Sequence, residues 1–409
     1  ILMKYIILLG DGMADRPRAD LGGKTCLQAA RTPNLDQLAT LGQVGMVHTV
    51  PEGYAPGSDV ANLSVMGYDP RKYYTGRSPL EAASIGVALG PDDVAYRCNL
   101  VTLKVLGGST ASGRRQALME DFSAGHISTQ EARTLIEEID RALGSEHIRF
   151  YPGVSYRHLM VWKGGRDRIE CTPPHDIQDK DIQDYLPRGE GDDIINELMA
   201  ASFDLLTNHP VNKSRLDNGK RAANSIWLWG QGKRPSMPTF REKYGLEGAV
   251  ISAVDLTKGL GVYAGFEVIN VPGATGWLDT NYVGKAEHAL FALKTKDIVY
   301  LHVEAPDEAG HTGDVKNKVR AIEDFDEFIV GNIMHGMKQF DEYRILALPD
   351  HPTPLEIRTH SAEPVPFVLY DSRSERKGGP VTYDERIADR KEALVFKEGY
   401  KLMDHFLGK

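Results

Sequence analysis

The chain has little cysteine, and none of it is paired in a metal or redox motif. Its 409 residues include Cys26, Cys98 and Cys171, which are widely spaced and form no C-x-x-C. An odd, scattered set of this kind argues against a disulfide framework and indicates free thiols in a reducing compartment. We therefore expect a cytoplasmic protein.

Long apolar runs and an excess of positive charge are also missing. No stretch approaches the roughly 20 apolar residues that a membrane span requires. The apolar run at the start has the length of a strand and ends in Gly-Asp-Gly, so we expect no signal peptide. The net charge of -9 argues against a nucleic-acid partner, because such proteins normally carry a basic face. A small anionic substrate is still possible where bound cations dominate the local field.

What the chain does contain is an alternation of short apolar runs and helical patterns. Alternation of this kind predicts an α/β fold with a mostly parallel sheet flanked by helices. Helical patterns begin near Thr32-Pro33 and cover residues 277–294 and 315–337. The predicted strands are Lys4–Leu9, Met46–Val50, Ile226–Trp229, Ala249–Ala253, Ile298–Val303, Ile345–Leu348 and Val365–Leu369.

The middle of the chain has a different character, with more charge and more polar turns. It contains candidate strands at Ala95–Val105 and Leu159–Trp162 and a helix at Ser128–Leu143. We interpret residues 78–212 as a smaller α+β unit inserted into the α/β domain, which is then formed by residues 1–77 and 213–409. The polar residues described next lie on both sides of this insert, so the two flanking segments must form one domain if they share a site.

Three aspartates each come just after a predicted buried strand, and three histidines lie close behind them in the sequence. Ligands of an open α/β sheet collect at the carboxyl ends of its strands. Carboxylates brought together there would repel one another unless divalent cations were present. Mixed imidazole and carboxylate ligation suits Mn²⁺, Zn²⁺ or Co²⁺ better than Ca²⁺. The candidate ligands are Asp11, Asp307, His311, Asp350, His351 and His360.

Ser58 stands in Gly57-Ser58-Asp59 at the head of a predicted helix. Serine is a common helix N-cap, so the position alone has an ordinary structural explanation. The same position offers free N–H groups and positive potential to a phosphate. A serine oxygen beside a divalent cation also loses its proton more easily. We therefore take Ser58 as the candidate nucleophile of a phosphoryl-transfer site.

Several longer stretches carry a resemblance to a known family. MKYIILLGDGMADRP, PGSDVANLSVMGYDP, VEAPDEAGHTGD and LPDHPTP are similar to segments of the archaeal-type cofactor-independent phosphoglycerate mutases, which belong to the alkaline phosphatase superfamily. The resemblance covers essentially the whole chain and implies two divalent ions, Mn²⁺ above all, with Zn²⁺, Co²⁺ or Mg²⁺ as alternatives. It also implies the grouping of their ligands. One ion would be held by Asp307, His311 and His360, and the other by Asp11, Ser58, Asp350 and His351.

The resemblance further implies the interconversion of 3-phosphoglycerate and 2-phosphoglycerate, a step of glycolysis and gluconeogenesis, through a phosphoserine at Ser58. The insert would act as a lid that holds the glycerate and keeps water out. Lys258, after a predicted strand, could neutralise the phosphoryl oxygens. Candidate substrate contacts in the insert are Arg97, Arg114, Arg115, His126, Arg157 and His158.

Two other functions stay open from the sequence. Bacterial mutases of the superfamily have a histidine shortly after the nucleophile, whereas this chain has Asn62. The surrounding segment resembles a subgroup for which homoserine phosphorylation has been suggested, so a homoserine phosphotransferase is one alternative. A metal-dependent phosphatase is the other, because the same site would hydrolyse a phosphate ester if water were admitted.

Overall fold

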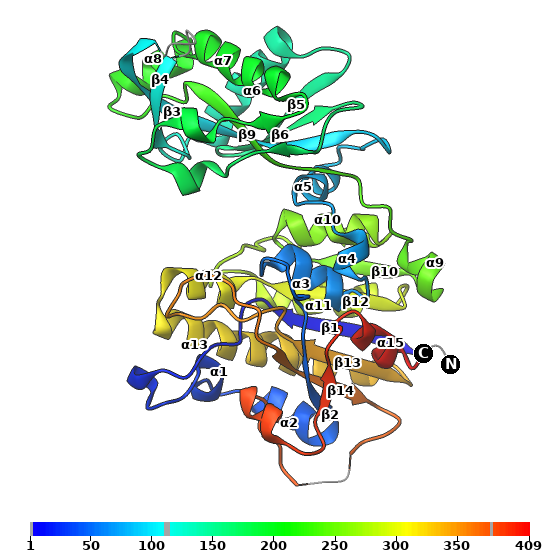
Figure 1. Ribbon diagram of the computed structural model, residues 1–409. Coiled ribbons are helices and arrows are strands. Elements are labelled where there is room, and N and C mark those ends of the chain that lie inside the picture. Colours follow the sequence, from blue (N-terminus) through cyan, green and yellow to red (C-terminus); the bar gives the residue numbers. More distant parts are fainter. Residues whose placement is uncertain (1–2, 110–114, 377–378) are drawn as a thin grey trace. The chain divides into compact units, whose positions relative to one another are not determined.

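The computed structural model describes residues 3–109, 115–376 and 379–409. They form two compact units, which Figure 1 shows in chain colours. The first consists of Ile1–Tyr74 and Ser236–Lys409, and the second is the inserted segment Thr75–Pro235. Within the described residues, no helix is both long and apolar enough to cross a membrane. Cys26, Cys98 and Cys171 are free thiols.

The first unit is built on an eight-stranded sheet in the order β11-β10-β12-β1-β13-β14-β2-β15. β10, β11, β12, β1 and β13 are parallel to one another, and β14 runs antiparallel to both of its neighbours. β15 is parallel to β2. The strands are β1 (Lys4–Gly10), β2 (Gln43–Val47), β10 (Gly248–Ile251), β11 (Glu267–Ile269), β12 (Ile298–Val303), β13 (Tyr343–Leu348), β14 (Val365–Asp371) and β15 (Leu394–Phe396). The predicted α/β fold with a mostly parallel sheet is confirmed.

Helices cover both faces of this sheet (Figure 1). One layer contains α3 (Ser58–Val65), α4 (Pro70–Tyr73), α10 (Asp255–Tyr263) and α15 (Lys401–Leu407). The other contains α1 (Cys26–Ala29), α2 (Pro33–Leu41), α11 (Tyr282–Ala292) and α13 (Val315–Asp324), which a π-helical turn at Phe325–Gly331 joins to α14 (Asn332–Gly336). α9 (Phe240–Tyr244) precedes β10, and α12 (Ala305–Thr312) follows β12.

The central strands are apolar on both sides because both faces are covered. All residues of β12 are buried, and so are the last five of β1. Val299 and Leu301 belong to the core under α11 and α13. Side chains alternate along a strand, so Tyr300 and His302 point to the opposite face, toward α3 and α10. This alternation decides which polar side chains of β12 reach the site described below.

The inserted unit has an antiparallel sheet in the order β4-β3-β6-β5, with β9 on the other side of β3. Its strands are β3 (Val94–Ser109), β4 (Arg115–Asp121), β5 (Ile148–Val154), β6 (Arg157–Trp162) and β9 (Ser225–Lys233), with a small pair β7 (Ile169–Glu170) and β8 (Arg188–Gly189). Its helices are α5 (Ser78–Ser84), α6 (Thr129–Leu143), α7 (Asp192–Leu206) and α8 (Pro210–Asp217). A Ser128–Glu131 capping box starts α6.

The end of the insert lies further along the chain than the sequence suggested. We expected the insert to end at residue 212 and assigned Ile226–Trp229 to the parallel sheet. In the structure this segment belongs to β9, which pairs antiparallel with β3 from Ser225 to Lys233. An apolar strand carries no mark of the sheet it joins, and the partner in this case lies more than a hundred residues earlier in the chain.

Candidate metal centre

The three predicted aspartates meet because their strands are neighbours. β1 lies between β12 and β13, all three parallel, with Gly10 paired with Val303 and Leu9 with Leu348. The polar residues that follow these strands therefore emerge at one edge of the sheet. Asp11 and Asp350 lie in the loops there, and Asp307 lies in the first turn of α12.

One group of ligands surrounds the imidazole of His351. Its Nε2 lies 3.5 Å from Oδ1 of Asp11, 3.4 Å from Oδ2 of Asp350 and 3.1 Å from Oγ of Ser58. Asp11, Asp350 and His351 are fully buried, and Ser58 is nearly so. The Nδ1 of His351 lies 3.2 Å from the Pro352 carbonyl oxygen. Donation from Nδ1–H to that oxygen leaves the Nε2 lone pair facing the group, as a metal ligand requires.

A second group surrounds Asp307. Its Oδ2 lies 3.1 Å from Nε2 of His311, and its Oδ1 lies 3.5 Å from Nε2 of His360. The two imidazole Nε2 atoms are themselves 3.0 Å apart. The Nδ1 of His311 faces the Arg358 carbonyl oxygen at 3.0 Å, which fixes this ring in the same way. The ring of His360 also lies 4.3 Å from that of His351, so the two groups are neighbours.

The centre gathers buried carboxyl groups whose negative charge is disfavoured without a proton or a cation nearby. Burial raises the pKa of Asp11 well above its usual range, and the nearby Asp350 and Glu304 raise it further. Burial also raises the pKa of Glu304 to about 8. Asp307 differs: burial alone would raise its pKa, but hydrogen bonds from His311 and His360 hold it well below the ordinary value. Oδ1 of Asp11 is buried and has no hydrogen-bond partner among the described residues. This oxygen and the converging imidazoles fit divalent cations.

Sequence reasoning missed the residues that support the ligands. Asn62 donates from Nδ2 to Oδ2 of Asp350 at 2.8 Å and to the Ser58 carbonyl at 2.8 Å. Its own Oδ1 accepts from the Tyr300 hydroxyl at 2.6 Å. Asn62, which stands where the bacterial mutases have a histidine, thus connects the start of α3 to the predicted ligand Asp350. His302 of β12 lies 2.8 Å from Asp11.

The hydroxyl of Thr353 supports the other group, because it donates to Oδ1 of Asp307. The sequence did contain a signal for one of the supporting residues. His302 is a histidine inside an otherwise apolar strand, four residues before the Pro306-Asp307 pair. The predicted ligands all come after a strand, whereas His302 is the last residue but one of β12 itself.

The predicted cation Lys258 lies in the first unit, on α10, which packs against α3. It is half-buried. Burial lowers the pKa of the buried Lys285 to about 8, the charge of Glu304 opposes this shift, and the charge of Lys258 adds to it. Lys285 donates to the carbonyl oxygen of His302 at 3.2 Å. Lys285 therefore lies at the end of β12, and Lys258 is close enough to influence its pKa.

In the inserted unit, Arg97 lies in β3 beside Trp229 of β9. Its guanidinium stands 4.3 Å from the indole centroid and 3.2 Å from a carboxylate oxygen of Glu81. The indole N–H donates to Oδ1 of Asn99 at 3.0 Å, and the ring of His175 packs against the indole edge at 5.4 Å. Trp229 and His175 were not predicted. Aromatic contacts of this kind hold a guanidinium in one orientation.

His126 and Arg157 are exposed and flank one tyrosine. The His126 ring lies 5.9 Å from the Tyr156 ring, and the Arg157 guanidinium stands 5.4 Å from it. His126 has a positive φ of 51° in the loop after β4. Of the remaining candidates, Arg114 lies outside the described residues, and the side chain of Arg115 is likewise not described.

The structure places His158, another predicted substrate contact, in the core of the inserted unit. Its side chain is buried among the core residues of β6, and its Nδ1 accepts a hydrogen bond from the Gly153 N–H at 3.0 Å. Burial lowers the pKa of this imidazole to about 3, so the ring is neutral. Alternation explains the placement, because His158 shares its face of the strand with the core residues Met160 and Trp162.

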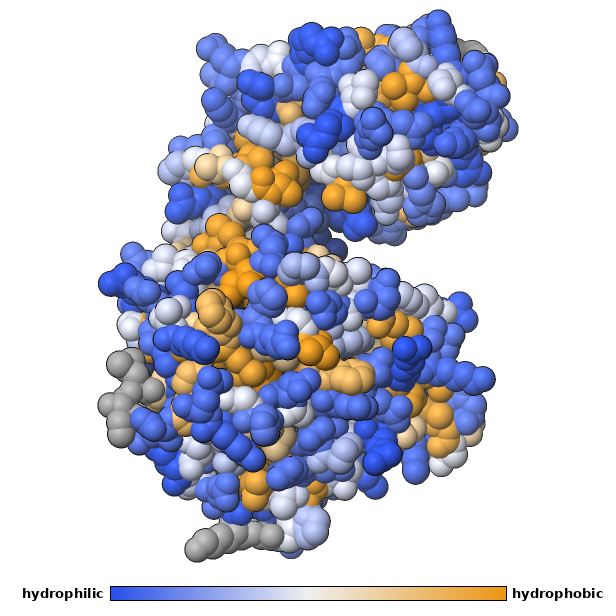
Figure 2. All heavy atoms as spheres, turned by 180° about the vertical axis from the view of Figure 1, so that it is seen from behind, coloured by the Kyte–Doolittle hydropathy of each residue, from blue (hydrophilic) through white to orange (hydrophobic). Residues whose placement is uncertain are grey.

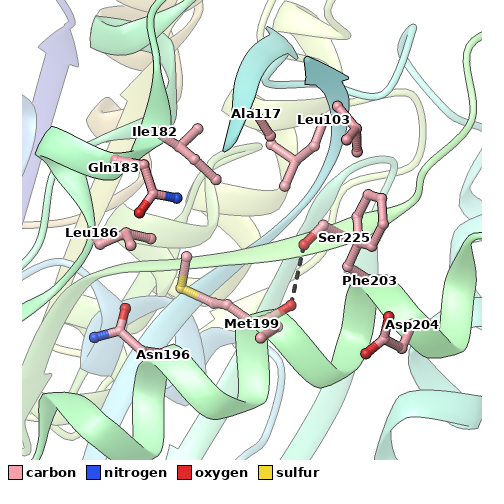
Figure 3. A pocket seen from close by; sticks show the side chains of 12 residues that line it. Leu103, Ala117, Ile182, Gln183, Leu186, Asn196, Met199, Phe203, Asp204 and Ser225 are labelled. Atoms are coloured by element: carbon pink, nitrogen blue, oxygen red, sulfur yellow. Dashed lines mark hydrogen bonds between the residues drawn. The ribbon is translucent and has the colours of Figure 1, made fainter. Parts of the chain in front are cut away.

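A pocket of about 350 Å³ lies within the inserted unit, between α7 and the strands (Figure 3). Met199, Leu186 and Ile182 project into it, with Phe203 and Leu103 at its other side. Among the residues that the structure describes, the lining contains no lysine, arginine or histidine. A largely apolar lining of this kind is unsuited to a phosphorylated acid.

Comparison with known proteins gives consistent results. Residues 39–212 match a family model described as 2,3-bisphosphoglycerate-independent phosphoglycerate mutase. A Geobacter sulfurreducens protein described as a probable 2,3-bisphosphoglycerate-independent phosphoglycerate mutase is 58% identical over 405 residues, which are 99% of this chain and 100% of that protein. The 2,3-bisphosphoglycerate-independent phosphoglycerate mutase of Methanosarcina acetivorans is 54% identical over 387 residues, 94% of each chain. The solved structure of the cofactor-independent phosphoglycerate mutase from Thermoplasma acidophilum has a TM-score of 0.68 at 27% identity and covers 100% of this chain and 99% of its own.

Proposed function

The chain belongs to the family of 2,3-bisphosphoglycerate-independent phosphoglycerate mutases, and we propose that it interconverts 3-phosphoglycerate and 2-phosphoglycerate through a phosphoserine at Ser58. The observation that carries the proposal is the position of the Ser58 hydroxyl. Ser58 is the first residue of α3. Its Oγ lies 3.1 Å from Nε2 of His351, beside the buried carboxylates of Asp11 and Asp350. The free thiols and the small acidic substrate accord with a cytoplasmic glycolytic or gluconeogenic enzyme.

The centre would hold two divalent ions. Asp307, His311 and His360 would bind one, and Asp11, Ser58, Asp350 and His351 would bind the other. We propose Mn²⁺ as the most suitable ion because the donors mix imidazole and carboxylate, with Zn²⁺, Co²⁺ and Mg²⁺ as alternatives. When bound, the ions supply the positive charge that makes the serine hydroxyl more acidic and stabilises charge on the phosphoryl oxygens.

The residues of the chain then have distinct tasks. Ser58 Oγ loses its proton and attacks phosphorus, the bond between phosphorus and O3 of the substrate breaks, and the leaving O3 takes up the proton. The 2-hydroxyl of glycerate then attacks the phosphoserine, its proton returns to Ser58 Oγ, and the phosphoryl group leaves as part of 2-phosphoglycerate. The N-terminus of α3 directs positive potential at the phosphoryl oxygens. Lys258 on the neighbouring α10 would add a positive charge there. In the inserted unit, Arg97, His126 and Arg157 are the candidate contacts to the carboxylate of the substrate.

The test is to incubate the Mn²⁺-loaded protein with 3-phosphoglycerate and follow the phosphorus NMR signals. We expect 2-phosphoglycerate to appear with little inorganic phosphate, and no reaction in Ser58→Ala. Release of inorganic phosphate alone would identify a phosphatase. No turnover of either phosphoglycerate, with O-phosphohomoserine formed from homoserine and a phosphoryl donor, would identify the other alternative. The named relatives favour the mutase over both.

A further inference from the structure

His302 is a buried, polar side chain that the proposed reaction does not use. It lies in the middle of the sheet on β12, has no exposed surface and points toward the layer of α3 and α10. Its ring stands between two partners. Nε2 lies 2.8 Å from Oδ2 of Asp11, and Nδ1 lies 3.0 Å from Oγ of Ser252.

The surroundings of Ser252 decide which ring nitrogen carries hydrogen toward Asp11. Ser252 Oγ accepts the Val254 N–H at 2.9 Å, so its own hydroxyl hydrogen is free to be donated. The better acceptor is Nδ1 of His302 at 3.0 Å, because the Val254 carbonyl oxygen is 3.5 Å away. With Nδ1 accepting, the ring hydrogen sits on Nε2 and is donated to Asp11. A doubly protonated ring would donate to Asp11 as well, so the direction does not depend on the charge of the ring.

This donation leaves the two oxygens of Asp11 with different roles. Oδ2 is occupied by the imidazole N–H. Oδ1 is buried without a hydrogen-bond partner among the described residues and faces Nε2 of His351 at 3.5 Å. A carboxylate held by one oxygen in this way can rotate little, and its other oxygen stays directed at the ion position.

We propose that His302 is a positioning residue, which fixes the Asp11 carboxylate so that Oδ1 binds the ion shared with Asp350 and His351. The inference rests on the proposed function, because it assumes an ion at that group. Asp350 is held in a comparable way: Asn62 donates to its Oδ2 and is oriented in turn by the Tyr300 hydroxyl. His302 gives the cleaner test, because Asn62 also bonds the Ser58 carbonyl.

A competing arrangement uses the same residues differently. Nε2 of His302 is also 3.4 Å from Oε2 of the buried Glu304, and His302, Asp11 and Glu304 together could hold an ion of their own. In that case Nε2 would carry a lone pair instead of hydrogen, and Ser252 would have to accept from Nδ1. The two arrangements differ in the number of ions bound per chain.

The experiment measures Mn²⁺ binding, with free Mn²⁺ followed by electron paramagnetic resonance, in the full-length protein and in four variants. His302→Leu removes the donor, His302→Gln offers an amide N–H in place of Nε2–H, and Ser252→Ala removes the hydroxyl that sets the tautomer. His335→Gln, at an exposed position of α14, is the matched control.

We expect two ions per chain in the parent protein. His302→Leu should weaken one of the two sites by about 10- to 100-fold and leave the other unchanged. His302→Gln should keep both affinities within about threefold, as expected when a comparable hydrogen bond replaces the original. Ser252→Ala should weaken the same site by about two- to tenfold, the effect of one lost hydrogen bond. His335→Gln should match the parent.

Three results would contradict either the positioning role of His302 or the metal centre itself. Parent-like binding in a folded His302→Leu variant, or in Ser252→Ala if the leucine variant does not fold, contradicts the positioning role. Three ions in the parent and two in both His302 variants identify His302 as a ligand and also contradict it. A parent protein that binds no Mn²⁺ removes the metal centre itself, and with it the proposed function.

Discussion

Ser58 Oγ lies 3.1 Å from Nε2 of His351, although 293 residues separate the two in the chain. The contact joins the first turn of α3 to the loop after β13, and it brings a hydroxyl to the ring that also faces Asp11 and Asp350. A serine that served only as a helix cap would bond a backbone N–H of its own helix. At α3 the N-cap is Gly57, and Ser58 is the first helical residue.

Replacing Ser58 by alanine should reduce mutase activity at least about a thousandfold, because removing a nucleophile leaves only the background of the remaining site. The affinity for the ion near Asp307 should stay at the parent value, since Ser58 is not among its ligands. Coupled enolase assays and metal analysis measure the two effects. Ser64→Ala is the control, because Ser64 is a buried serine of the same helix whose Oγ has no hydrogen-bond partner among the described residues. Equal activity losses in both variants would contradict a specific role for Ser58.

Replacing His360 or His351 by alanine should each remove a different ion. His360 belongs with Asp307 and His311, whereas His351 belongs with Asp11 and Asp350. Each variant should retain about one Mn²⁺ per chain, because loss of one of the few protein ligands weakens binding severely. Metal analysis after gel filtration checks the count, and a second titration of the double variant should find none. Loss of both ions in either single variant would show that the two groups are one site.

Replacing Asn62 by leucine should destabilise the protein. The change removes the hydrogen bonds that Asn62 makes to Oδ2 of Asp350 and to the buried Tyr300 hydroxyl. We expect a loss of about 1–3 kcal/mol in the free energy of unfolding, typical of an unsatisfied buried polar group. Urea unfolding of the metal-free protein measures it. Tyr300→Phe should cost less, because Asn62 then keeps its bond to Asp350. An unchanged stability of Asn62→Leu would mean that these bonds contribute nothing net.

The metal-free protein should lose stability as the pH rises from about 4.5 to 8. Burial, and then the charge of Asp307, raise the pKa of Glu304 from 4.5 to about 8. The folded state therefore binds more protons than the unfolded state in this range, and stability falls with rising pH. The hydrogen bond with Asp307 raises the pKa of His311 from 6.5 to about 9, so its contribution is present below pH 6.5 and lost toward pH 9.

Bound ions should reverse this trend, because an ion replaces the proton of His311 and its charge favours the ionised form of the nearby Glu304. Thermal melts with EDTA and with Mn²⁺ at pH 6, 7 and 8 should show that the stabilisation by Mn²⁺ grows with pH. In Glu304→Gln the metal-free protein should lose less stability between pH 6 and 8 than the parent. A parent protein whose metal-free melting temperature rises over this range would contradict the account of the carboxylates.

Replacing Arg97 by glutamine should raise the KM for 3-phosphoglycerate about tenfold or more, the cost of one lost charge-assisted contact. Steady-state kinetics measure it. Arg149→Gln is the control, because Arg149 is a surface arginine of the same unit that pairs with Asp140. An unchanged KM in the Arg97 variant would remove this residue from the substrate site.

The sequence made the convergence of the three aspartates predictable because each follows a buried apolar run, and parallel strands bring such positions to one edge. The supporting residues could not be found in this way. Asn62 looks like an ordinary helical asparagine, and His302 like a core histidine, until the helix and strand are packed together. His158 shows the opposite case: its histidine character suggested a substrate contact, whereas its alternation with Met160 and Trp162 indicated a place in a core. The boundary of the inserted unit was missed for a similar reason, because the apolar pattern of β9 does not show that this strand pairs with β3.

The most direct test of the central claim is to look for the phosphoryl group on Ser58 during turnover. The Mn²⁺-loaded protein is mixed with 3-phosphoglycerate, quenched in acid within one turnover, digested and examined by mass spectrometry. We expect a phosphorylated peptide containing Ser58, which disappears as glycerate is added in excess and the phosphoglycerates form. Formation of 2-phosphoglycerate at full rate, with Ser58 unmodified at every quench time, would contradict it.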